Sequence, residues 1–267
     1  MLKSLLPQVV ATAVHAGEAI MAVYANPDSA TFTKADSSPL TLADLASDQV
    51  IDAGLTDLSP GWPILSEESA QTGYAERQRW KTFWLVDPLD GTREFIKRNG
   101  EFTVNIALIE DGQPVLGVVY APVLDICYYA ARGAGAFIRR GNHPPQAIQV
   151  AQQLAGESLK VVASRSHSDE RTAALLARLG DHQCISMGSS LKLCLVAEGA
   201  AHFYPRLGPT MEWDTAAAHA VVVAAGGTVC DRSGNPLQYN KADLHNPEFF
   251  VLAKSDLPLF SLIADAP

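Results

Sequence analysis

The chain has 267 residues, of which 48% are hydrophobic and 18% are charged, and its formal net charge is −9. This composition predicts a large buried core and excludes wholesale disorder. An acidic chain is also a poor general binder of polyanions, which argues against a nucleic-acid partner.

The first half of the chain predicts two helices followed by an antiparallel sheet. Apolar residues recur at helical spacing over residues 2–24, and a second helix is expected over Thr41–Leu55, ending at Gly54 or just beyond it. The apolar run Phe83–Val86 predicts a strand that ends at Asp87. Three more strands, with the hairpin signal Asp111-Gly112 after the first, are expected at Phe102–Ile109, Val115–Tyr120 and Ile126–Ala131.

After about residue 155 the pattern alternates between strands and helices, which is typical of an α/β arrangement. Strands are expected at Val161–Ala163, Gln183–Ser186, Ala201–Tyr204, Thr228–Cys230 and Phe249–Leu252. Helices are expected at Asp169–Leu179, Ser189–Glu198 and Thr215–Ala225. The loop Gly141–Pro145 is the best boundary candidate. We predict an α+β part over 1–150 with most candidate metal ligands, and an α/β part over 151–267 with Asp214 and the substrate side.

Acidic residues recur where predicted strands or helices begin or end. They are Asp44 in the first turn of the second helix, Glu67-Glu68 after an apolar pair, Asp87 and Asp90 around Pro88-Leu89, and Asp214 after Trp213. Pro88 restricts the backbone and lacks a donor, so we expect a tight turn to bring Asp87, Asp90 and the Leu89 carbonyl to one point.

The residues after this turn favour an anion. Gly91 allows close backbone approach, and Thr92 supplies a hydroxyl and starts a short helix whose amides would face a phosphate. Two carboxylates about 4 Å apart repel by roughly 4 kcal/mol at an effective dielectric near 20. Several together therefore need protons or a cation, and an all-oxygen ligand set selects Mg²⁺ or Mn²⁺.

Each acidic feature also has an ordinary structural interpretation. Asp-Pro and Asp-Gly are common turn formers, Glu67-Glu68 fits a solvated turn, and Asp214 and Asp44 fit helix caps. Their joint occurrence favours the metal site.

These motifs resemble the inositol monophosphatase superfamily, magnesium-dependent and lithium-sensitive phosphatases, over essentially the whole chain. The pieces are Thr41–Asp44, Ser66–Ser69, Asp87–Thr92 and Trp213–Ala217. The resemblance implies a layered αβαβα sandwich of the inositol monophosphatase and fructose-1,6-bisphosphatase type. The match is narrower to the family's 3'(2'),5'-bisphosphate nucleotidases, through Lys34–Asp36 with Ser38-Pro39, Glu94–Phe102, Ser164–His167, Gly188–Lys192 and Tyr204–Arg206.

The resemblance implies a role for each site residue. Glu67, Asp87 and the Leu89 carbonyl would hold a first magnesium ion, and Asp87, Asp90 and Asp214 a second. Asp44 and Thr92 would orient and activate the nucleophilic water. The substrate would also contact the Gly91 and Thr92 amides and a nucleotide side formed by His167, Ser189, Lys192 and Arg206. From the residues alone, Arg206 also fits a rim salt bridge, His167 a helix start, and Lys97-Arg98 either a solvated turn or an attractor of the second phosphate.

The expected reaction is removal of the 3'-phosphate of adenosine 3',5'-bisphosphate, with the sulfated analogue 3'-phosphoadenylyl sulfate left open. Two alternatives remain: an inositol monophosphatase or sugar bisphosphatase with the same metal core, and a metal-binding scaffold without catalysis. The resemblance implies two or three Mg²⁺ ions, substitution by Mn²⁺, and inhibition by Li⁺ and Ca²⁺.

The N-terminal segment, the length of the apolar stretches and the cysteines bear on where the protein is located. A single charge, Lys3, precedes an interrupted apolar segment, so we expect no signal peptide, and no stretch reaches the roughly 18 apolar residues of a membrane span. Four cysteines without a CxxC pair predict reduced core residues of a cytoplasmic protein: Cys127, Cys184, Cys194 and Cys230. Peripheral association with the inner face of a membrane, and a monomer or a homodimer, stay open.

Overall fold

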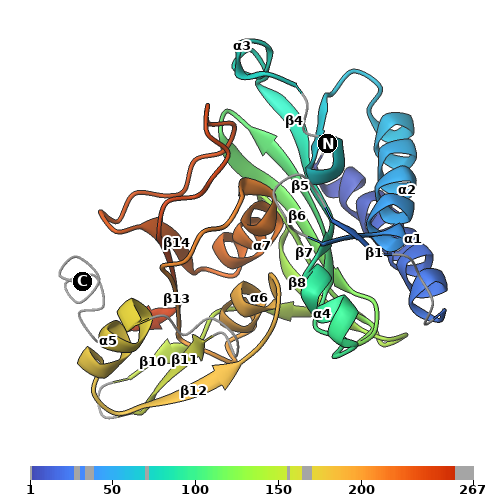
Figure 1. Ribbon diagram of the computed structural model, residues 1–267. Coiled ribbons are helices and arrows are strands. Elements are labelled where there is room, and N and C mark those ends of the chain that lie inside the picture. The colour runs from blue at the N-terminus through green and yellow to red at the C-terminus, as the bar shows by residue number, and fades with distance from the viewer. Residues whose placement is uncertain are drawn as a thin grey trace.

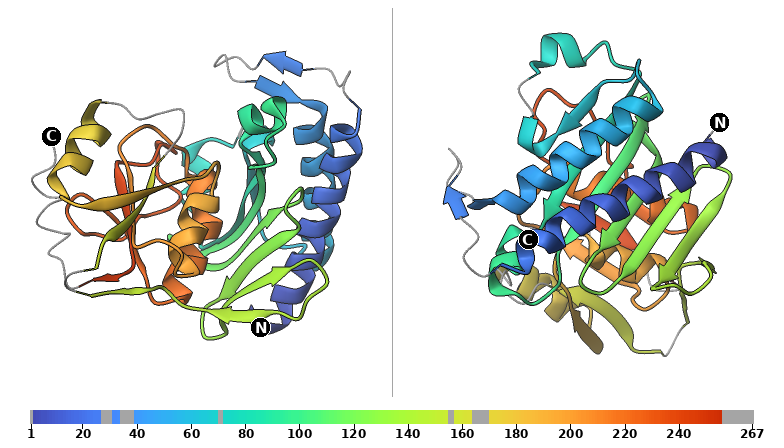
Figure 2. Two further views of the ribbon diagram at one scale, coloured as in Figure 1. Left: turned by 90° about the horizontal axis from the view of Figure 1, so that it is seen from below. Right: turned by 90° about the vertical axis from the view of Figure 1, so that its right-hand side faces the viewer.

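The computed structural model describes residues 2–26, 31–33, 39–69, 72–154, 157–163 and 170–255. Its elements form five layers in which two sheets enclose a pair of helices and carry further helices on their outer faces (Figures 1 and 2). This is the αβαβα sandwich that the resemblance implied.

The larger sheet has seven strands in the order β3-β4-β5-β6-β7-β8-β9, so each strand pairs with its neighbour in the chain. The pairs are antiparallel except β3 with β4, which is parallel. Asp111 and Gly112 have φ of 49° and 76°, the left-handed conformations that a two-residue hairpin turn requires. The strands are β3 (Ile64–Ser66), β4 (Thr82–Asp90), β5 (Thr103–Glu110), β6 (Gln113–Ala121), β7 (Ile126–Ala131), β8 (Gly135–Arg140) and β9 (Gln146–Ile148).

Helices bury both faces of this sheet. Alternate residues of β5 face opposite sides: Ile106 and Leu108 pack in the cluster with α1 (Leu2–Tyr24) and α2 (Leu42–Leu58), whereas Ala107 and Ile109 pack with α6 (Leu191–Ala197) and α7 (Glu212–Ala224). Helix α7 lies very close to the sheet, because a Cβ placed on Gly117 would come within 2.1 Å of the Ala217 carbonyl oxygen. Glycine is therefore required at this crossing.

Helix α1 departs from one sequence expectation. It is long and apolar enough, by length and composition alone, to cross a membrane. The sequence test missed this because it asked for an uninterrupted apolar run. In the fold, Val9, Ala13 and Ile20 are fully buried against the sheet and α2, so the apolar face serves the core.

The smaller sheet has five strands in the order β12-β11-β13-β15-β14. Strand β11 is parallel to both of its neighbours, and β15 is antiparallel to β13 and β14. Leu175 of α5 (Glu170–Arg178) packs on the outer face with Phe203 and Phe250. The strands are β11 (Leu159–Ala163), β12 (His182–Ser186), β13 (Phe203–Arg206), β14 (Thr228–Asp231) and β15 (Phe249–Leu252).

Short elements complete the described chain. Two small pairs are β1 (Thr31–Thr33) with β2 (Pro39–Thr41) and β10 (Gln152–Gln153) with β16 (Lys254–Ser255). Single-turn helices are the 3₁₀ turn Glu67–Ser69, α3 (Tyr74–Arg77) and α4 (Thr92–Lys97).

Three details differ from the sequence expectations. Helix α2 continues through Gly54 to Leu58, where Ser59 caps it. The loop Gly141–Pro145 lies inside the larger sheet, because β9 pairs with β8 beyond it; the division near residue 150 stays a prediction. Cys184 is exposed on the edge strand β12, whereas the other three cysteines are buried as expected.

Candidate active site

The acidic run lies on β4, which continues through Asp90 instead of ending at Asp87. Its pairing with β5 shifts register between these two residues. In a regular strand, residues three apart face opposite sides, and an irregularity of this kind reverses that relation. Strand geometry, rather than the predicted tight turn, therefore brings the two carboxylates together.

Backbone amides orient four aspartates, each through one carboxylate oxygen. The amide of Leu89 donates to Asp87 at 3.1 Å, and that of Ser190 donates to Asp90 at 2.5 Å. Similar bonds reach Asp44 from Thr41 at 2.8 Å and Asp214 from Met211 at 2.9 Å. Asp44 and Asp214 are thus the third residues of α2 and α7 and accept from the N-cap residues Thr41 and Met211. Asp44 has the capping role of its ordinary interpretation, whereas Asp214 is not itself the N-cap.

Electrostatics shows that these groups share one environment. Burial raises the pKa of Asp87 well above its ordinary value, and the charges of Glu67, Asp90, Asp214 and Asp44 raise it further. Burial, followed by the charge of Asp90, raises the pKa of Asp214 to about 8. The pKa of Asp90 is also raised by burial, against the opposing charge of Lys192. Protons or a cation must therefore compensate this cluster.

The donor set fits magnesium by its chemistry. Glu67, Asp87, Asp90 and Asp214 offer only carboxylate oxygens, which are ligands for a hard cation. Across the described ranges, no three His, Cys, Asp or Glu side chains already have their donor atoms gathered around one point. Assembly of the ligand set around one ion therefore requires side-chain adjustment. The ligand roles, including that of the Leu89 carbonyl, stay predictions.

The structure brings Asp44 and Thr92 together across 48 residues of sequence. The Thr92 hydroxyl lies 3.5 Å from Asp44 Oδ1, at the outer limit of a hydrogen bond. Asp44 is only 2% exposed, because α2 places it beneath the end of β4. A buried carboxylate beside a hydroxyl is suited to orienting a water and accepting its proton.

A cavity of about 350 Å³ adjoins the carboxylates on the side of α6 and β13. It mixes four acidic groups with three basic ones and two aromatic rings, which are Asp90, Glu94, Glu101, Asp214, Lys97, Lys192, Arg206, Tyr204 and Phe249. The volume suits a small organic molecule. Of the predicted substrate side, Gly91, Ser189, Lys192 and Arg206 all line this cavity.

Two cations are held inside the cavity by different means. The Lys192 ammonium lies 6.0 Å from the centre of the Tyr204 ring. Burial lowers its pKa, and the charge of Asp90 opposes that shift. Arg206 donates to the Pro209 carbonyl at 3.1 Å, and its buried Nε has no hydrogen-bond partner among the described residues.

The Ser189 side chain packs directly against Gly91. The Ser189 hydroxyl lies 2.8 Å from the Asp90 carbonyl and 2.7 Å from the Glu101 carbonyl, and Ser189 itself has φ of 49°. These hydrogen bonds connect Ser189 to the acidic run. The Ser189 hydroxyl must break its bond to a carbonyl before it can donate to a substrate.

We predict that Gly91→Ala lowers kcat by at least tenfold. Gly91 has φ of 94°, and an added Cβ would lie 2.2 Å from the Ser189 hydroxyl oxygen, so both Ser189 and the start of α4 must move. Steady-state kinetics with a thermal melt measures this. Gly133→Ala, at φ of 76° with open space around it, is the matched control and should lose stability alone. Equal activity in both variants would contradict the prediction.

Sequence reasoning missed a buried polar network behind Asp90. Ser190, whose amide holds Asp90, has a hydroxyl 2.8 Å from both Thr103 Oγ1 and Asn105 Oδ1. Thr103 and Asn105 are buried on β5, where a polar residue inside an apolar strand was the available signal. This network fixes the amide that orients Asp90.

Other predicted residues separate into three groups. Lys97 lines the cavity, whereas Arg98 donates to the Tyr24 carbonyl at 2.8 Å and covers the Tyr24 ring at 4.0 Å. His167, with the segment Ser164–His167, lies outside the described residues, as do Lys34–Asp36 and Ser38. Glu68 lies next to Glu67 in the 3₁₀ turn.

The fold and its acidic strand end define a class of phosphatase. The chain belongs to the inositol monophosphatase family, whose model matches residues 1–257. Members of this family depend on magnesium.

Two of the similar proteins are named CysQ, and a third shows the fold alone. The chain is 52% identical over 249 residues to the 3'(2'),5'-bisphosphate nucleotidase CysQ of Salmonella typhimurium, covering 92% of this chain and 99% of that protein. The crystal structure of CysQ from Bacteroides thetaiotaomicron matches with a TM-score of 0.81 and 46% identity, over 92% of this chain and 96% of that one. The suhB protein of Bartonella henselae, at 24% identity and a TM-score of 0.80 over 98% of each chain, shows the fold alone.

Proposed function

We propose that this protein is a magnesium-dependent 3'(2'),5'-bisphosphate nucleotidase that releases the 3'-phosphate of adenosine 3',5'-bisphosphate in sulfur metabolism. The observation that carries the proposal is the cavity beside the carboxylate cluster, because it places three basic side chains next to a candidate hydrolytic site. The Salmonella typhimurium relative, whose name states this activity, supports the same choice.

The proposed site has two sides, one that binds metal and the transferred phosphate and one that binds the rest of the nucleotide. Glu67, Asp87, the Leu89 carbonyl, Asp90 and Asp214 would hold magnesium, which supplies charge compensation and polarises phosphate oxygens. Asp44 and Thr92 orient the attacking water, and Asp44 accepts its proton. The amides of Gly91 and Thr92 bind the phosphate that is transferred.

On the other side, Lys192 and Arg206 bind the rest of the nucleotide. Each holds its charge partly buried, and a charge-assisted contact in such a place is stronger than one in water. Lys97 attracts the second phosphate from the rim. His167 and Ser189 remain proposed contacts of the same side.

Several finer properties belong to the same proposal. Two or three Mg²⁺ ions act per site, Mn²⁺ substitutes for Mg²⁺, and Li⁺ and Ca²⁺ inhibit, because Ca²⁺ accepts more ligands and looser geometry. We also propose a cytoplasmic enzyme, as a monomer or homodimer. The sulfated analogue of the nucleotide is a second substrate of the same cavity.

A substrate panel tests the proposal. At saturating magnesium, we expect kcat/KM for adenosine 3',5'-bisphosphate to exceed that for inositol 1-phosphate and fructose 1,6-bisphosphate by at least tenfold. Lys192→Met should raise the nucleotide KM about 10- to 100-fold, since a hydrogen bond to a charged group contributes about 1.5–3 kcal/mol. Phosphate release measures both effects.

The exposed Lys81→Met is the matched control and should leave KM unchanged. A clear preference for inositol 1-phosphate would replace the nucleotidase by the alternative phosphatase. Absence of phosphate release from all three substrates, with metal bound, would leave the non-catalytic scaffold.

A further inference from the structure

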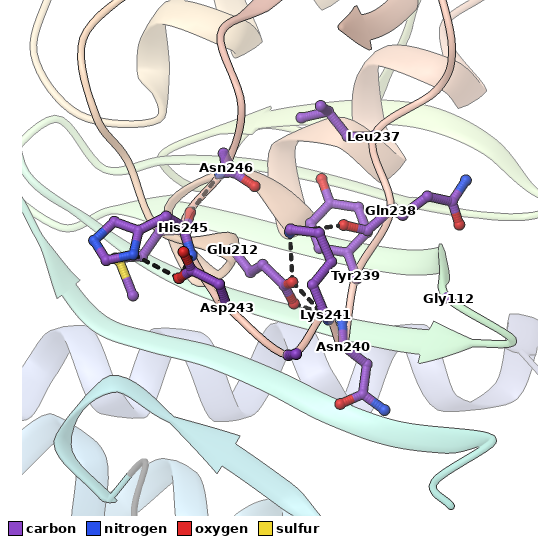
Figure 3. Close-up of polar contacts among 12 residues, drawn as sticks. Gly112, Glu212, Leu237, Gln238, Tyr239, Asn240, Lys241, Asp243, His245 and Asn246 are labelled. Carbon is purple, nitrogen blue, oxygen red and sulfur yellow. Dashed lines mark hydrogen bonds and ion pairs between the residues drawn. The ribbon is translucent and has the colours of Figure 1, made fainter. Parts of the chain in front are cut away.

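A loop that is distant in sequence from the acidic run packs against the start of α7, the helix that carries Asp214. This loop, residues 238–246, follows β14 and passes beside the first turn of α7 (Figure 3). The Glu212 amide donates to the Leu244 carbonyl at 2.9 Å, and Met211 forms a bridge with His245. The loop is therefore built onto the helix start by backbone contacts as well as side chains.

Glu212 is the centre of the first contact. Its carboxylate is 0% exposed and accepts hydrogen bonds from the Asn240 amide at 2.6 Å and the Lys241 amide at 3.0 Å. The Lys241 ammonium lies 2.5 Å from Glu212 Oε1 and balances its charge (Figure 3). A buried carboxylate is stable only with such partners, so the loop must hold this conformation while α7 is in place.

Asn246 makes the second contact, directly behind Asp214. Its Nδ2 donates to the Met211 carbonyl at 2.7 Å and lies 3.1 Å from Thr215 Oγ1. Met211 in turn donates its amide to Asp214 Oδ2 at 2.9 Å. The Asn246 amide also donates to the Thr210 carbonyl at 2.8 Å, and that carbonyl belongs to the same peptide as the Met211 N–H. Asn246 therefore holds the peptides on both sides of Met211, including the one that orients Asp214, and it is not among the residues that line the cavity.

Arg77 anchors the loop from its other side. Its guanidinium, on a residue only 3% exposed, donates to Asn240 Oδ1 at 2.9 Å and to the Lys241 carbonyl at 3.2 Å. Asn240 Nδ2 returns a bond to the Arg77 carbonyl at 2.7 Å. Arg77 belongs to the connection between β3 and β4, the same connection that begins with Glu67.

We propose that Arg77, Asn240, Glu212 and Asn246 are positioning residues that set Asp214 relative to Glu67 and so determine the affinity for divalent metal. The inference rests on the proposed function, because it assigns these two carboxylates to the metal site. Side chains behind metal ligands commonly change metal affinity by 10- to 100-fold when they are replaced. The cluster would thus act on catalysis through metal affinity rather than through substrate contact.

The sharpest variant is Asn240→Gly. Asn240 has φ of 69°, which glycine adopts without strain, and both backbone amides to Glu212 remain. Only the two side-chain bonds to Arg77 are lost. We expect the Kd for Mn²⁺, measured by electron paramagnetic resonance on the metal-free protein, to rise about tenfold. The magnesium concentration for half-maximal activity should rise in parallel, while kcat at saturating magnesium and KM for the nucleotide stay within threefold of wild type.

Arg77→Ala and Arg77→Lys extend the series. Alanine should raise the Mn²⁺ Kd by 10- to 100-fold, and lysine should recover little of the loss because it lacks the planar fork. The controls are Asn235→Gly, which removes one bond in an exposed turn, and the exposed Arg132→Ala. Both should bind Mn²⁺ as wild type does.

An unchanged Mn²⁺ Kd in Asn240→Gly, even with a lowered melting temperature, would overturn the inference and leave a structural role. If Arg77→Ala does not fold, Asn240→Gly still decides. A wild-type protein that binds Mn²⁺ but does not hydrolyse the nucleotide would instead overturn the proposed function. The two failures are therefore distinguishable.

Discussion

Asp90→Asn will lower kcat/KM for adenosine 3',5'-bisphosphate by about 10³- to 10⁴-fold. The carboxamide oxygen still accepts the Ser190 amide, so the local backbone is kept and only the charge is lost. A bound metal ion contributes several kcal/mol to stabilising the transition state, and about 1.4 kcal/mol corresponds to a tenfold change in rate. Phosphate release at saturating magnesium measures the loss.

Asp111→Asn is the matched control for this substitution. Asp111 lies in the exposed β5–β6 hairpin turn at φ of 49°, a conformation that asparagine adopts readily. The control should keep wild-type activity and stability. Activity of Asp90→Asn within tenfold of wild type would exclude the proposed role of this carboxylate in binding metal.

The second large effect is a pH dependence of stability that emerges when magnesium is removed. The pKa of Asp214 is raised from its ordinary 3.8 to about 8, so between these values the folded state keeps a proton that the unfolded state releases. Stability of the metal-free protein should therefore fall as pH rises from about 4 to 8, by up to about 1.4 kcal/mol per pH unit for this one group.

Magnesium should suppress that slope. Binding requires ionised carboxylates and releases their protons, so the stabilisation by magnesium must grow as pH rises toward 8. Thermal melts at pH 6 and pH 8, with chelator and with magnesium, measure the difference. Asp214→Asn should reduce the slope of the metal-free protein, while Asp87 and Asp90, whose pKa values burial also raises, keep the remainder. Equal slopes with and without magnesium would contradict the prediction.

Much of the fold follows from local patterns. Helix α1 and strands β7 and β15 have the predicted boundaries, because apolar periodicity and terminal turns are local signals. The end of β4 was wrong: Asp-Pro and Asp-Gly suggested a turn, but pairing with β5 carries the strand to Asp90. The start of α7 was also wrong by one turn, since Glu212 is buried there by partners from a distant loop.

For the candidate site too, some residues were evident from the sequence and others only from the tertiary structure. The acidic residues and their order are evident from the chain, and the family resemblance rests on them. The contacts of Ser190, Asn105 and Arg77 were not predicted. Ser190 lies in the quoted piece Gly188–Lys192 without an assigned role, the polar Asn105 in an apolar strand was a signal that went unused, and Arg77 has no distinctive sequence context. Their roles arise from partners 85 or more residues away in the chain, such as Asn105 for Ser190.

By itself, therefore, the sequence determined the hard-cation chemistry of the carboxylates, which depends on residue type and local spacing. It also carried the motifs of the family resemblance, and that resemblance implied the layered class of the fold. Only the tertiary structure decided that Asp44 faces Thr92, that Lys192 and Arg206 share a cavity with Asp90, and that Cys184 is exposed on a sheet edge. The physical reason is that burial and neighbouring charge, which set pKa and orientation, come from packing between layers that no local pattern encodes.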